Sequence, residues 1–239
     1  MKEYEKEVQK LYDNIEKIWP ENNVWYDYTH KKIIDFIYKN AVIFKYNSNV
    51  LNAGSGGSVY PGINGNFFHV DISEKFISKL PNSYVASIEN LPFNNELFDS
   101  AICVGSVLNY CDAAIALIEI YRVMKPGSYL ILEYERSETG ELIFQQNYGK
   151  SSTRQCYEYN DQTNHNIWLY SDEYINNILE TIGFKVIKNK YYHIFSSLFN
   201  QIIKDEDKAG KLAKLDRFAV WPFRKILAHN RILVARKCN

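Results

Sequence analysis

A glycine turn and an acidic residue further along the chain are the residues whose types and spacing best suit ligand binding. Residues 49–58 pass from a short apolar run into Gly54 and Gly56, the pattern of a buried strand that ends in a turn nearly without side chains. Glycine allows positive φ and lets a ligand approach main-chain N–H groups closely. Asp71 ends the next apolar run, where a carboxylate accepts hydrogen bonds from ribose hydroxyls in nucleotide-binding α/β units. We expect Ser73 to cap the following helix and Asp71 to remain free for a ligand.

Three histidines are candidate general bases, because imidazole accepts protons near neutral pH. His30 follows an aromatic cluster, His165 lies in a long polar segment, and His193 ends an expected strand. A hydrogen-bonded or surface histidine is the alternative interpretation of each. His69 is interpreted as a strand residue, and His229, just before the last strand, as non-catalytic.

The composition of the chain limits the classes of protein to which it can belong. Its 239 residues include 28 acidic and 28 basic side chains and no apolar run of the roughly 18 residues that a membrane span needs. The charged first residues lack a signal-peptide core, so we expect a cytoplasmic protein that does not enter a membrane. The four cysteines lack zinc-type spacing, and we expect reduced thiols and no metal. Residues 185–237 contain 13 basic and 4 acidic side chains, an excess that is compatible with an anionic substrate or nucleic acid.

Apolar strands alternate with helical patterns at short spacing, which predicts an α/β fold with a parallel sheet and right-handed crossovers. After a first strand that begins at residue 49, the expected strands are 66–73, 83–88, 101–108, 129–134, 184–194 and 231–236. The expected helices between them are 73–80, 113–124 and 172–182.

Helical and polar segments flank this core. An amphipathic helix is expected over 2–19, and Thr29 is expected to cap a second helix. Residues 140–170 are too long for a simple connection, so they form a functional cover or are partly disordered. Residues 197–228 are expected to be helical in two pieces.

The order of these segments resembles the class I S-adenosylmethionine-dependent methyltransferases from about residue 48 to the C-terminus, with motifs like those of methyltransferase type 11. The resemblance rests on 51–56 (Leu-Asn-Ala-Gly-Ser-Gly), 69–73 (His-Val-Asp-Ile-Ser), 89–93 (Glu-Asn-Leu-Pro-Phe) with Phe98 and Asp99, and 121–127 (Tyr-Arg-Val-Met-Lys-Pro-Gly). An NAD-dependent oxidoreductase, which shares only the glycines and the acid, is a distant alternative. We divide the chain into an N-terminal helical cap, 1–47, and a methyltransferase domain, 48–239, with cover insertions at about 140–170 and 196–228.

The resemblance implies a doubly wound sheet of seven strands, mostly parallel with the last strand antiparallel, and S-adenosylmethionine as the cofactor. It implies contacts to the methionine part, the ribose, the adenine and the sulfonium from residues at the ends of the first four strands. These cofactor-binding residues are Asn52, Ala53, Gly54, Ser55, Gly56, Asp71, Ile72, Ser87, Ile88, Glu89 and Ser106.

Three positions depart from the family pattern. Asn52 stands where an acid is usual, Ser58 where a third glycine is common, and Ser87 where an aspartate often receives the adenine amine. Losing one charge-assisted hydrogen bond costs roughly 1–3 kcal/mol, or about tenfold to a hundredfold in affinity. We therefore expect weakened cofactor binding rather than none.

The acceptor is expected to be a small polar metabolite, a sugar or a natural-product intermediate, methylated on oxygen or nitrogen. Candidate substrate-binding residues are Tyr28, Tyr110, Tyr134 and Tyr191; Glu135 and Tyr192 are further residues that can reach the acceptor. Two alternatives stay open: an RNA methyltransferase that uses the basic C-terminal third, and a non-catalytic member that binds the cofactor. A homodimer is possible.

Overall fold

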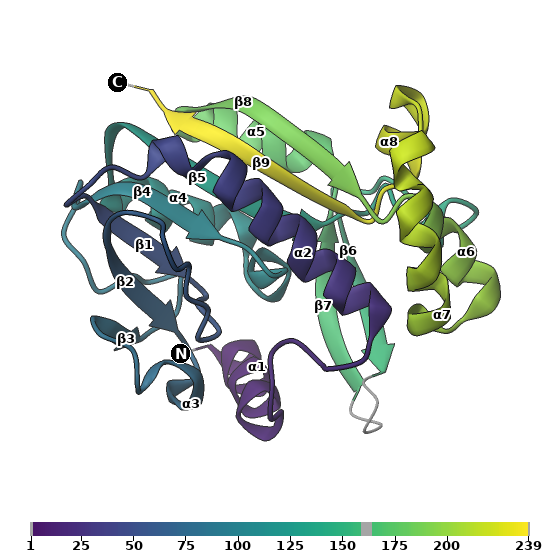
Figure 1. Ribbon diagram of the computed structural model, residues 1–239, viewed down its shortest axis with the longest axis horizontal. Helices are drawn as coiled ribbons and strands as arrows, with labels where there is room; N and C mark the ends of the chain where they lie inside the picture. The colour runs from purple at the N-terminus through teal and green to yellow at the C-terminus, as the bar shows by residue number, and fades with distance from the viewer. Residues whose placement is uncertain (1, 159–163, 239) are drawn as a thin grey trace.

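The computed structural model describes residues 2–158 and 164–238 and is built around a seven-stranded sheet in the order β3-β2-β1-β4-β5-β9-β8 (Figure 1). Its inner strands are apolar and buried on both faces, as in parallel sheets covered by helices. The strands are β1 (Asn49–Ala53), β2 (Asn66–Asp71), β3 (Ser83–Val85), β4 (Phe98–Cys103), β5 (Met124–Glu135), β8 (Phe184–Tyr192) and β9 (Asn230–Lys237).

The strands from β1 to β5 pair in parallel, and β9 runs antiparallel to both β5 and β8. The expected doubly wound, mostly parallel sheet of seven strands with an antiparallel last strand is therefore confirmed. In the ladder between β5 and β9, Glu135 lies directly opposite Asn230. Directly opposed residues of an antiparallel pair project from the same face of the sheet, which matters for the site below.

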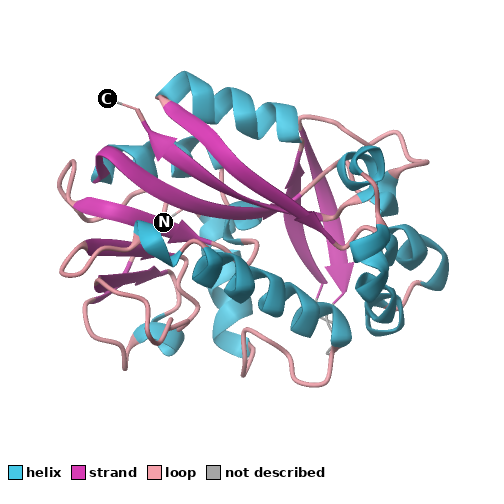
Figure 2. Cartoon of the chain, turned by 45° about the horizontal axis from the view of Figure 1, so that its top comes forward, coloured by secondary structure: helices cyan, strands magenta, loops and turns pink. Residues whose placement is uncertain are grey.

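Helices cover both faces of the sheet (Figure 2). On one face, α2 (Val24–Lys39) and the short η1 (Ala41–Ile43) pack against β1, β4, β5 and β9 through an apolar cluster that includes Phe36 and Ile131. On the other face, α4 (Ala113–Val123) and α5 (Asp172–Ile182) bury Leu117 and Leu179 in the larger apolar cluster. Both α4 and α5 lie close to their expected positions.

The N-terminal segments differ from the sequence-based expectation. Helix α1 is Glu3–Asn14, so residues 15–19 form a loop rather than the end of a helix. Helix α2 is capped by Asn23, whose side chain accepts from the N–H groups of Trp25 and Tyr26. The expected cap at Thr29 is wrong: Thr29 lies inside the helix, where its hydroxyl pairs with a histidine ring.

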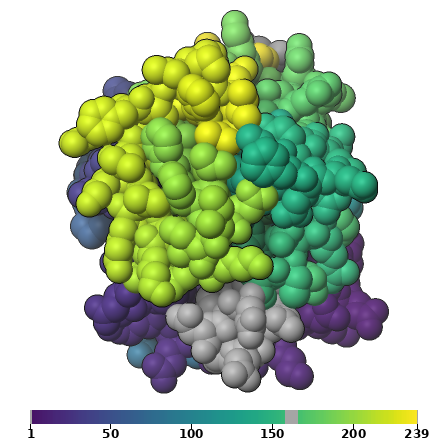
Figure 3. Space-filling model, turned by 90° about the vertical axis from the view of Figure 1, so that its right-hand side faces the viewer, coloured from purple at the N-terminus to yellow at the C-terminus, as the bar shows by residue number. Residues whose placement is uncertain are grey.

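The polar segment after β5 forms the short η3 (Gly140–Leu142) and a two-stranded antiparallel hairpin, β6 (Ser152–Glu158) and β7 (Asn164–Tyr170). The expected helical region before β9 consists of α6 (Phe195–Ile203), α7 (Glu206–Gly210), η4 (Lys211–Phe218) and α8 (Trp221–Leu227). Figure 3 shows these helices, in yellow and green, beside the teal segment around η3 at one end of the molecule.

The turns at the carboxyl ends of the strands also differ from the expectation. Strand β4 ends at Cys103, because Gly105 and Ser106 take positive φ of 84° and 59° and lead into η2 (Val107–Tyr110). The expected fourth strand, 101–108, is therefore too long. After β2, helix α3 is only Glu74–Ile77.

No helix in residues 2–158 and 164–238 has the length and apolar character needed to cross a bilayer. The described residues also contain no group of three or more His, Cys, Asp or Glu side chains with a geometry that could hold a metal ion. The four cysteines are free thiols.

Candidate functional site

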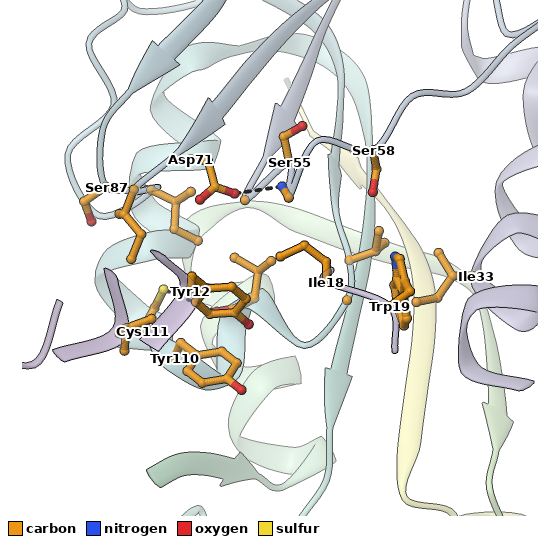
Figure 4. A pocket seen from close by; sticks show the side chains of 18 of the residues that line it. Tyr12, Ile18, Trp19, Ile33, Ser55, Ser58, Asp71, Ser87, Tyr110 and Cys111 are labelled. Carbon is orange, nitrogen blue, oxygen red and sulfur yellow. Dashed lines mark hydrogen bonds between the residues drawn. The ribbon is translucent and has the colours of Figure 1, made fainter. Parts of the chain in front are cut away.

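An open cavity of about 890 Å³ lies at the carboxyl ends of β1, β2 and β4 (Figure 4). We call it the first cavity. It is lined by the glycine turn, the end of β2, the segment after β3, α1, the loop after α1 and the start of α2. Its walls include Glu5, Val8, Tyr12, Ile18, Trp19, His30, Ile33, Gly54, Ser55, Gly56, Ser58, Asp71, Ile72, Ser87, Ile88, Gly105, Val107, Tyr110 and Cys111.

The turn after β1 brings main chain to the wall of this cavity. Gly54 has a φ of +66°, and a Cβ built there would lie 2.3 Å from a methyl carbon of Val107. Gly56 also takes positive φ, at 51°. A side chain at position 54 would clash and strain the backbone, so glycine is required for the turn to pack against η2.

Hydrogen bonds among buried polar groups hold this turn in place. The Asn52 amide donates to Ser55 Oγ at 3.2 Å and to the carbonyl oxygen of Ser58 at 3.0 Å. The ring Nδ1 of the buried His69 lies 3.0 Å from Ser55 Oγ. Asn52 is 2% exposed and does not line the cavity. An acid at position 52 could not donate to Ser58, so the departure from the family pattern has a structural role in this chain.

Asp71 presents an unpaired carboxylate to the first cavity. Oδ2 accepts the Gly56 N–H at 2.7 Å, and Oδ1 accepts the Ser73 N–H at 2.9 Å. Burial raises the pKa of Asp71, and these two N–H donors oppose that rise. No cationic side chain of the described chain pairs with it, so its remaining lone pairs suit the hydroxyl groups of a ligand.

Ser73 does not cap α3 as expected. Its hydroxyl donates to Asp13 Oδ1 at 2.6 Å, which fastens the loop side of α1 to β2. Gln9 on α1 donates to the carbonyl oxygen of Ile72 at 2.8 Å. Helix α1, which lies near α3 and the end of β2 in Figure 1, thus lines the first cavity and is held there by these side-chain hydrogen bonds.

The predicted cofactor-binding residues fall into two groups. Gly54, Ser55, Gly56, Asp71, Ile72, Ser87 and Ile88 line the first cavity. Asn52, Ala53, Glu89 and Ser106 do not. Glu89 is turned toward α1, where its carboxylate accepts from Lys2 Nζ at 2.5 Å, from Tyr4 and from the Asp112 N–H.

A second cavity of about 670 Å³ adjoins the first and shares five wall residues with it, namely Tyr12, Ile18, Trp19, Gly105 and Tyr110. Its remaining walls come from α2, β5, the hairpin, α7 and the start of β9. They are Trp25, Tyr26, Thr29, Ser106, Glu135, Tyr157, Ile167, Glu206, His229 and Asn230.

The second cavity holds ionisable groups that the first lacks. His229 Nε2 lies 3.1 Å from Glu135 Oε2, and Nδ1 lies 3.8 Å from Glu141 Oε2. Burial works against the imidazolium, but the neighbouring carboxylates outweigh it and raise the pKa of His229 to about 9. Burial and the neighbouring Glu141 raise the pKa of Glu206 to about 7. Near neutral pH His229 is therefore protonated, and Glu206 is close to the midpoint of its ionisation.

A buried carboxylate holds the wall between the cavities. Glu133 is fully buried, and its Oε2 accepts the N–H groups of Gly105 and Ser106 at 2.9 and 2.8 Å. Its Oε1 accepts from Tyr192 at 2.9 Å and from Asn230 Nδ2 at 2.8 Å. One side chain thus fixes both the turn after β4 and the first residue of β9.

The three candidate histidines lie in different places. His30 lines the first cavity against Trp19, with ring centroids 4.8 Å apart, and burial lowers its pKa. His193 is fully buried, and its two ring nitrogens lie 2.8 and 2.7 Å from the hydroxyls of Thr29 and Ser196. It lines neither cavity. His165 belongs to β7, and its side chain lies outside the described residues.

Of the candidate substrate-binding tyrosines, Tyr110 lines both cavities. Tyr28 bonds to Asp216, while Tyr134 and Tyr191 bond to Asp172. These three line neither cavity. The sequence-based interpretation set His229 aside and did not single out Glu206 or Asn230. A signal was available: an antiparallel last strand places its first residues beside the end of the fifth strand, at Glu135.

Comparisons with known proteins agree with this architecture. Residues 51–132 match the family model described as a methyltransferase domain. Among curated proteins, the chain is 31% identical over 136 residues to an uncharacterised protein of Methanocaldococcus jannaschii. The match covers 55% of this chain, and the chain spans about half the length of that relative.

Solved structures share the fold at low sequence identity. A protein of Listeria monocytogenes described as an S-adenosylmethionine-dependent methyltransferase superposes with a TM-score of 0.63 at 12% identity, over 88% of this chain and 99% of its own. A 1,6-didemethyltoxoflavin N1-methyltransferase of Burkholderia thailandensis, bound to its acceptor and S-adenosylhomocysteine, gives 0.58 at 11% identity over 98% and 87%. A [4+2]-cyclase, SpnF, gives 0.55 at 17% identity over 87% and 80%.

Proposed function

We propose that the chain transfers a methyl group from S-adenosylmethionine to a small polar molecule, because its fold is that of the class I S-adenosylmethionine-dependent methyltransferases and residues 51–132 match the methyltransferase family model. The first cavity is the proposed cofactor site, and the second is the proposed acceptor site. The acceptor atom is an oxygen or a nitrogen. The single observation that carries the proposal is that the two cavities share one wall.

The residues of the first cavity fit the cofactor. Gly54 and Gly56 present main chain without side chains at the cavity wall, and Asp71 offers carboxylate lone pairs for ribose hydroxyls. Ile72 and Ile88 supply apolar surface for the adenine, and Ser87 supplies a hydroxyl beside it. The indole Nε1 of Trp19 is buried without a hydrogen-bond partner among the described residues, so it can donate to an electron-rich group of a ligand.

The bound cofactor supplies an electrophilic methyl group on its sulfonium. The chain's own task is then to position the acceptor and to exclude water. Ile18, Trp19 and Gly105 form much of the shared wall, and two of these side chains are large and apolar. Ser106 Oγ donates to Glu135 Oε1 at 2.7 Å, which orients that carboxylate beside the wall. Glu135 and Glu206 are carboxylates that can take up a proton from the acceptor.

The proposal is tested by calorimetry followed by product detection. S-adenosylmethionine and S-adenosylhomocysteine are each titrated into the protein, and both are expected to bind in the first cavity with an affinity that depends on Asp71. The protein is then incubated with trideuteromethyl-labelled S-adenosylmethionine and a pool of small amines, phenols and sugars, and products are sought by mass spectrometry. Absence of cofactor binding would remove the proposal.

A second candidate function is a reaction in this fold that does not transfer a methyl group. One solved structure with this fold is described as a [4+2]-cyclase, and the substitutions at Asn52, Ser58 and Ser87 alter the turn and the adenine edge relative to the family pattern. The same experiment separates the two, because this candidate predicts cofactor binding without a labelled product.

The basic C-terminal third gives little support to an RNA substrate. Arg231 is buried and paired with Asp172 at 3.4 Å, and Lys237 donates to the carbonyl oxygens of Tyr121 and Met124. No lysine or arginine stands among the described residues that line either cavity. Binding of RNA phosphates requires such side chains at the surface that leads to the site.

A further inference from the structure

We propose that the acceptor is a small amine, and that the second cavity binds its protonated amino group between the carboxylates of Glu135 and Glu206 and the side-chain oxygen of Asn230. This inference rests on the proposed function, because it takes the second cavity as the acceptor site. It specifies the charge and the hydrogen-bonding groups of the acceptor.

The first support is the arrangement of hydrogen-bond acceptors. Asn230 is 2% exposed and lines the second cavity, yet its Oδ1 has no hydrogen-bond partner among the described residues. Its Nδ2 donates to the Glu133 carboxylate at 2.8 Å, which fixes the orientation of the amide. A buried carbonyl oxygen without a donor is costly, and a ligand that brings an N–H group removes that cost.

The second support is the position of Glu135. It lies directly opposite Asn230 in the ladder between β5 and β9, so both side chains project from the same face of the sheet. Its Oε1 accepts from Ser106 and its Oε2 from His229. Both residues line the second cavity, so a carboxylate and an amide of the same sheet face meet a ligand that enters it.

The third support is the balance of charge around the cavity. Three carboxylates, those of Glu135, Glu141 and Glu206, surround the single imidazolium of His229. Glu206 has no hydrogen bond to a described residue that would stabilise its charged form, and burial disfavours that form. A cationic ligand beside Glu206 supplies the missing positive charge, whereas an anionic ligand adds to the repulsion.

The aromatic part of the wall suits the same ligand. Trp25, Tyr26 and Tyr157 line the second cavity, and aromatic faces attract ammonium groups as well as apolar ring systems. The cavity is open to solvent at one side and closed by aromatic and apolar side chains at the other, as the sites of small organic molecules are. An amine attached to a ring or a short chain therefore matches both its polar and its apolar walls.

Three nearly isosteric compounds that differ in charge test the inference. Tyramine, tyrosol and 4-hydroxyphenylacetate carry a cationic, a neutral and an anionic group on the same phenol. Each is titrated calorimetrically into the protein, with and without saturating S-adenosylhomocysteine. We expect tyramine to bind at least tenfold more tightly than tyrosol, and 4-hydroxyphenylacetate to show no binding. Equal affinities, a preference for the acid, or no binding of tyramine would each overturn the inference.

Two variants test whether the preference for the cationic ligand arises in the second cavity. Glu206→Gln is expected to weaken tyramine binding threefold to tenfold and to leave tyrosol binding unchanged. Glu173→Gln, on the exposed side of α5 and outside both cavities, is the matched control and is expected to change neither. Undiminished tyramine binding by Glu206→Gln would contradict the proposed role of Glu206. Failure of S-adenosylhomocysteine to bind, with the tyramine preference intact, would instead remove the cofactor site and leave the amine site standing.

Discussion

The two cavities differ in the sequence separation of the residues that line them. One continuous stretch of strands and turns supplies Ser55, Ser58, Asp71 and Ser87 to the first cavity, and α1, α2 and η2 complete its lining. The second cavity joins segments that are far apart in sequence, from Tyr12 and Trp25 through Glu135 to Glu206 and His229. The strand-end part of the first cavity is thus a property of local sequence, whereas the second cavity exists only once the sheet and its flanking helices have assembled.

The cavities also differ in charge. The first presents two carboxylates, that of Asp71, which accepts a backbone N–H group, and that of Glu5 from α1. The second presents a histidine within a group of glutamates. The proposed cofactor site lies where proteins of this fold are expected to be alike, and the proposed acceptor site lies where they are expected to differ. Four predictions test this contrast, in order of expected effect.

The largest effect is expected at Glu133, which ties both cavities together. Glu133→Gln places an amide NH₂ among four donors, so at least two hydrogen bonds to a buried charge are lost. We expect the free energy of unfolding to fall by about 3 kcal/mol, measured by urea denaturation, and both ligand affinities to fall with it. A variant as stable as Glu173→Gln would show that the two cavities are not coupled through this residue.

Asp71→Ala is expected to act on the first cavity alone. Loss of the carboxylate removes the acceptor for ribose hydroxyls, and S-adenosylhomocysteine affinity is expected to drop about a hundredfold, or roughly 2.7 kcal/mol. Calorimetry measures both this affinity and that for tyramine, which we expect to stay within twofold. Asp35→Ala, a half-exposed carboxylate on α2, serves as the control. Unchanged cofactor affinity in Asp71→Ala would withdraw the assignment of the first cavity.

His229 is expected to make stability depend on pH. Its pKa is raised from 6.5 to about 9 in the folded state, so its contribution is complete below pH 6.5 and is lost as the pH rises through 9. The pKa of Glu206 is raised to about 7, so this residue makes the folded state less stable as the pH rises from 4.5 to 7. We expect the stability difference between the wild type and His229→Gln to shrink by on the order of 2 kcal/mol from pH 6.5 to 10. Urea denaturation at several pH values measures it, and a constant difference would mean that His229 is neutral.

The smallest effect is expected at Trp19, in the wall between the cavities. Trp19→Phe removes an indole N–H that has no partner in the described part of the chain and keeps an aromatic ring beside His30. The free protein is expected to become equally or more stable, while affinity for S-adenosylhomocysteine falls about threefold to fivefold. Thermal denaturation and calorimetry give the two readings. Lower stability with unchanged affinity would show that the indole serves packing only.

The sequence predicted the first cavity better than the second. The succession of strands along the chain and the turn at Gly54 follow from local apolar runs and from glycine, and Asp71 ends a strand that can be recognised by itself. The seven-stranded sheet with an antiparallel last strand was implied only by the family resemblance. The helix start at Asn23 was missed because Thr29, five residues into α2, has the same capping chemistry, and only tertiary contacts decide between them. The sequence position of His193 suggested a general base, but both of its ring nitrogens lie within hydrogen-bonding distance of buried hydroxyl groups.

The proposed acceptor site was harder to predict, because its residues come from several separate segments of the chain. His229 stands beside the last strand with no motif around it, and its chemistry arises from Glu135 and Glu141, which lie almost a hundred residues earlier in the chain. Tyr134 and Tyr191 were reasonable candidates by position, yet both point to Asp172 instead. Side-chain direction at the end of a strand depends on register, which apolar patterns alone specify only where one face is polar.

The placement of the tryptophans makes the protein its own optical probe. Two of its four, Trp168 and Trp221, are 41% and 59% exposed, whereas Trp19 stands between the cavities and Trp25 is buried against the second. Acrylamide quenches emission from exposed indoles first, so the remaining fluorescence comes from the two inner rings. Occupancy of the first cavity then perturbs one inner emitter, and occupancy of the second perturbs both, which allows the order of ligand entry to be followed without any label.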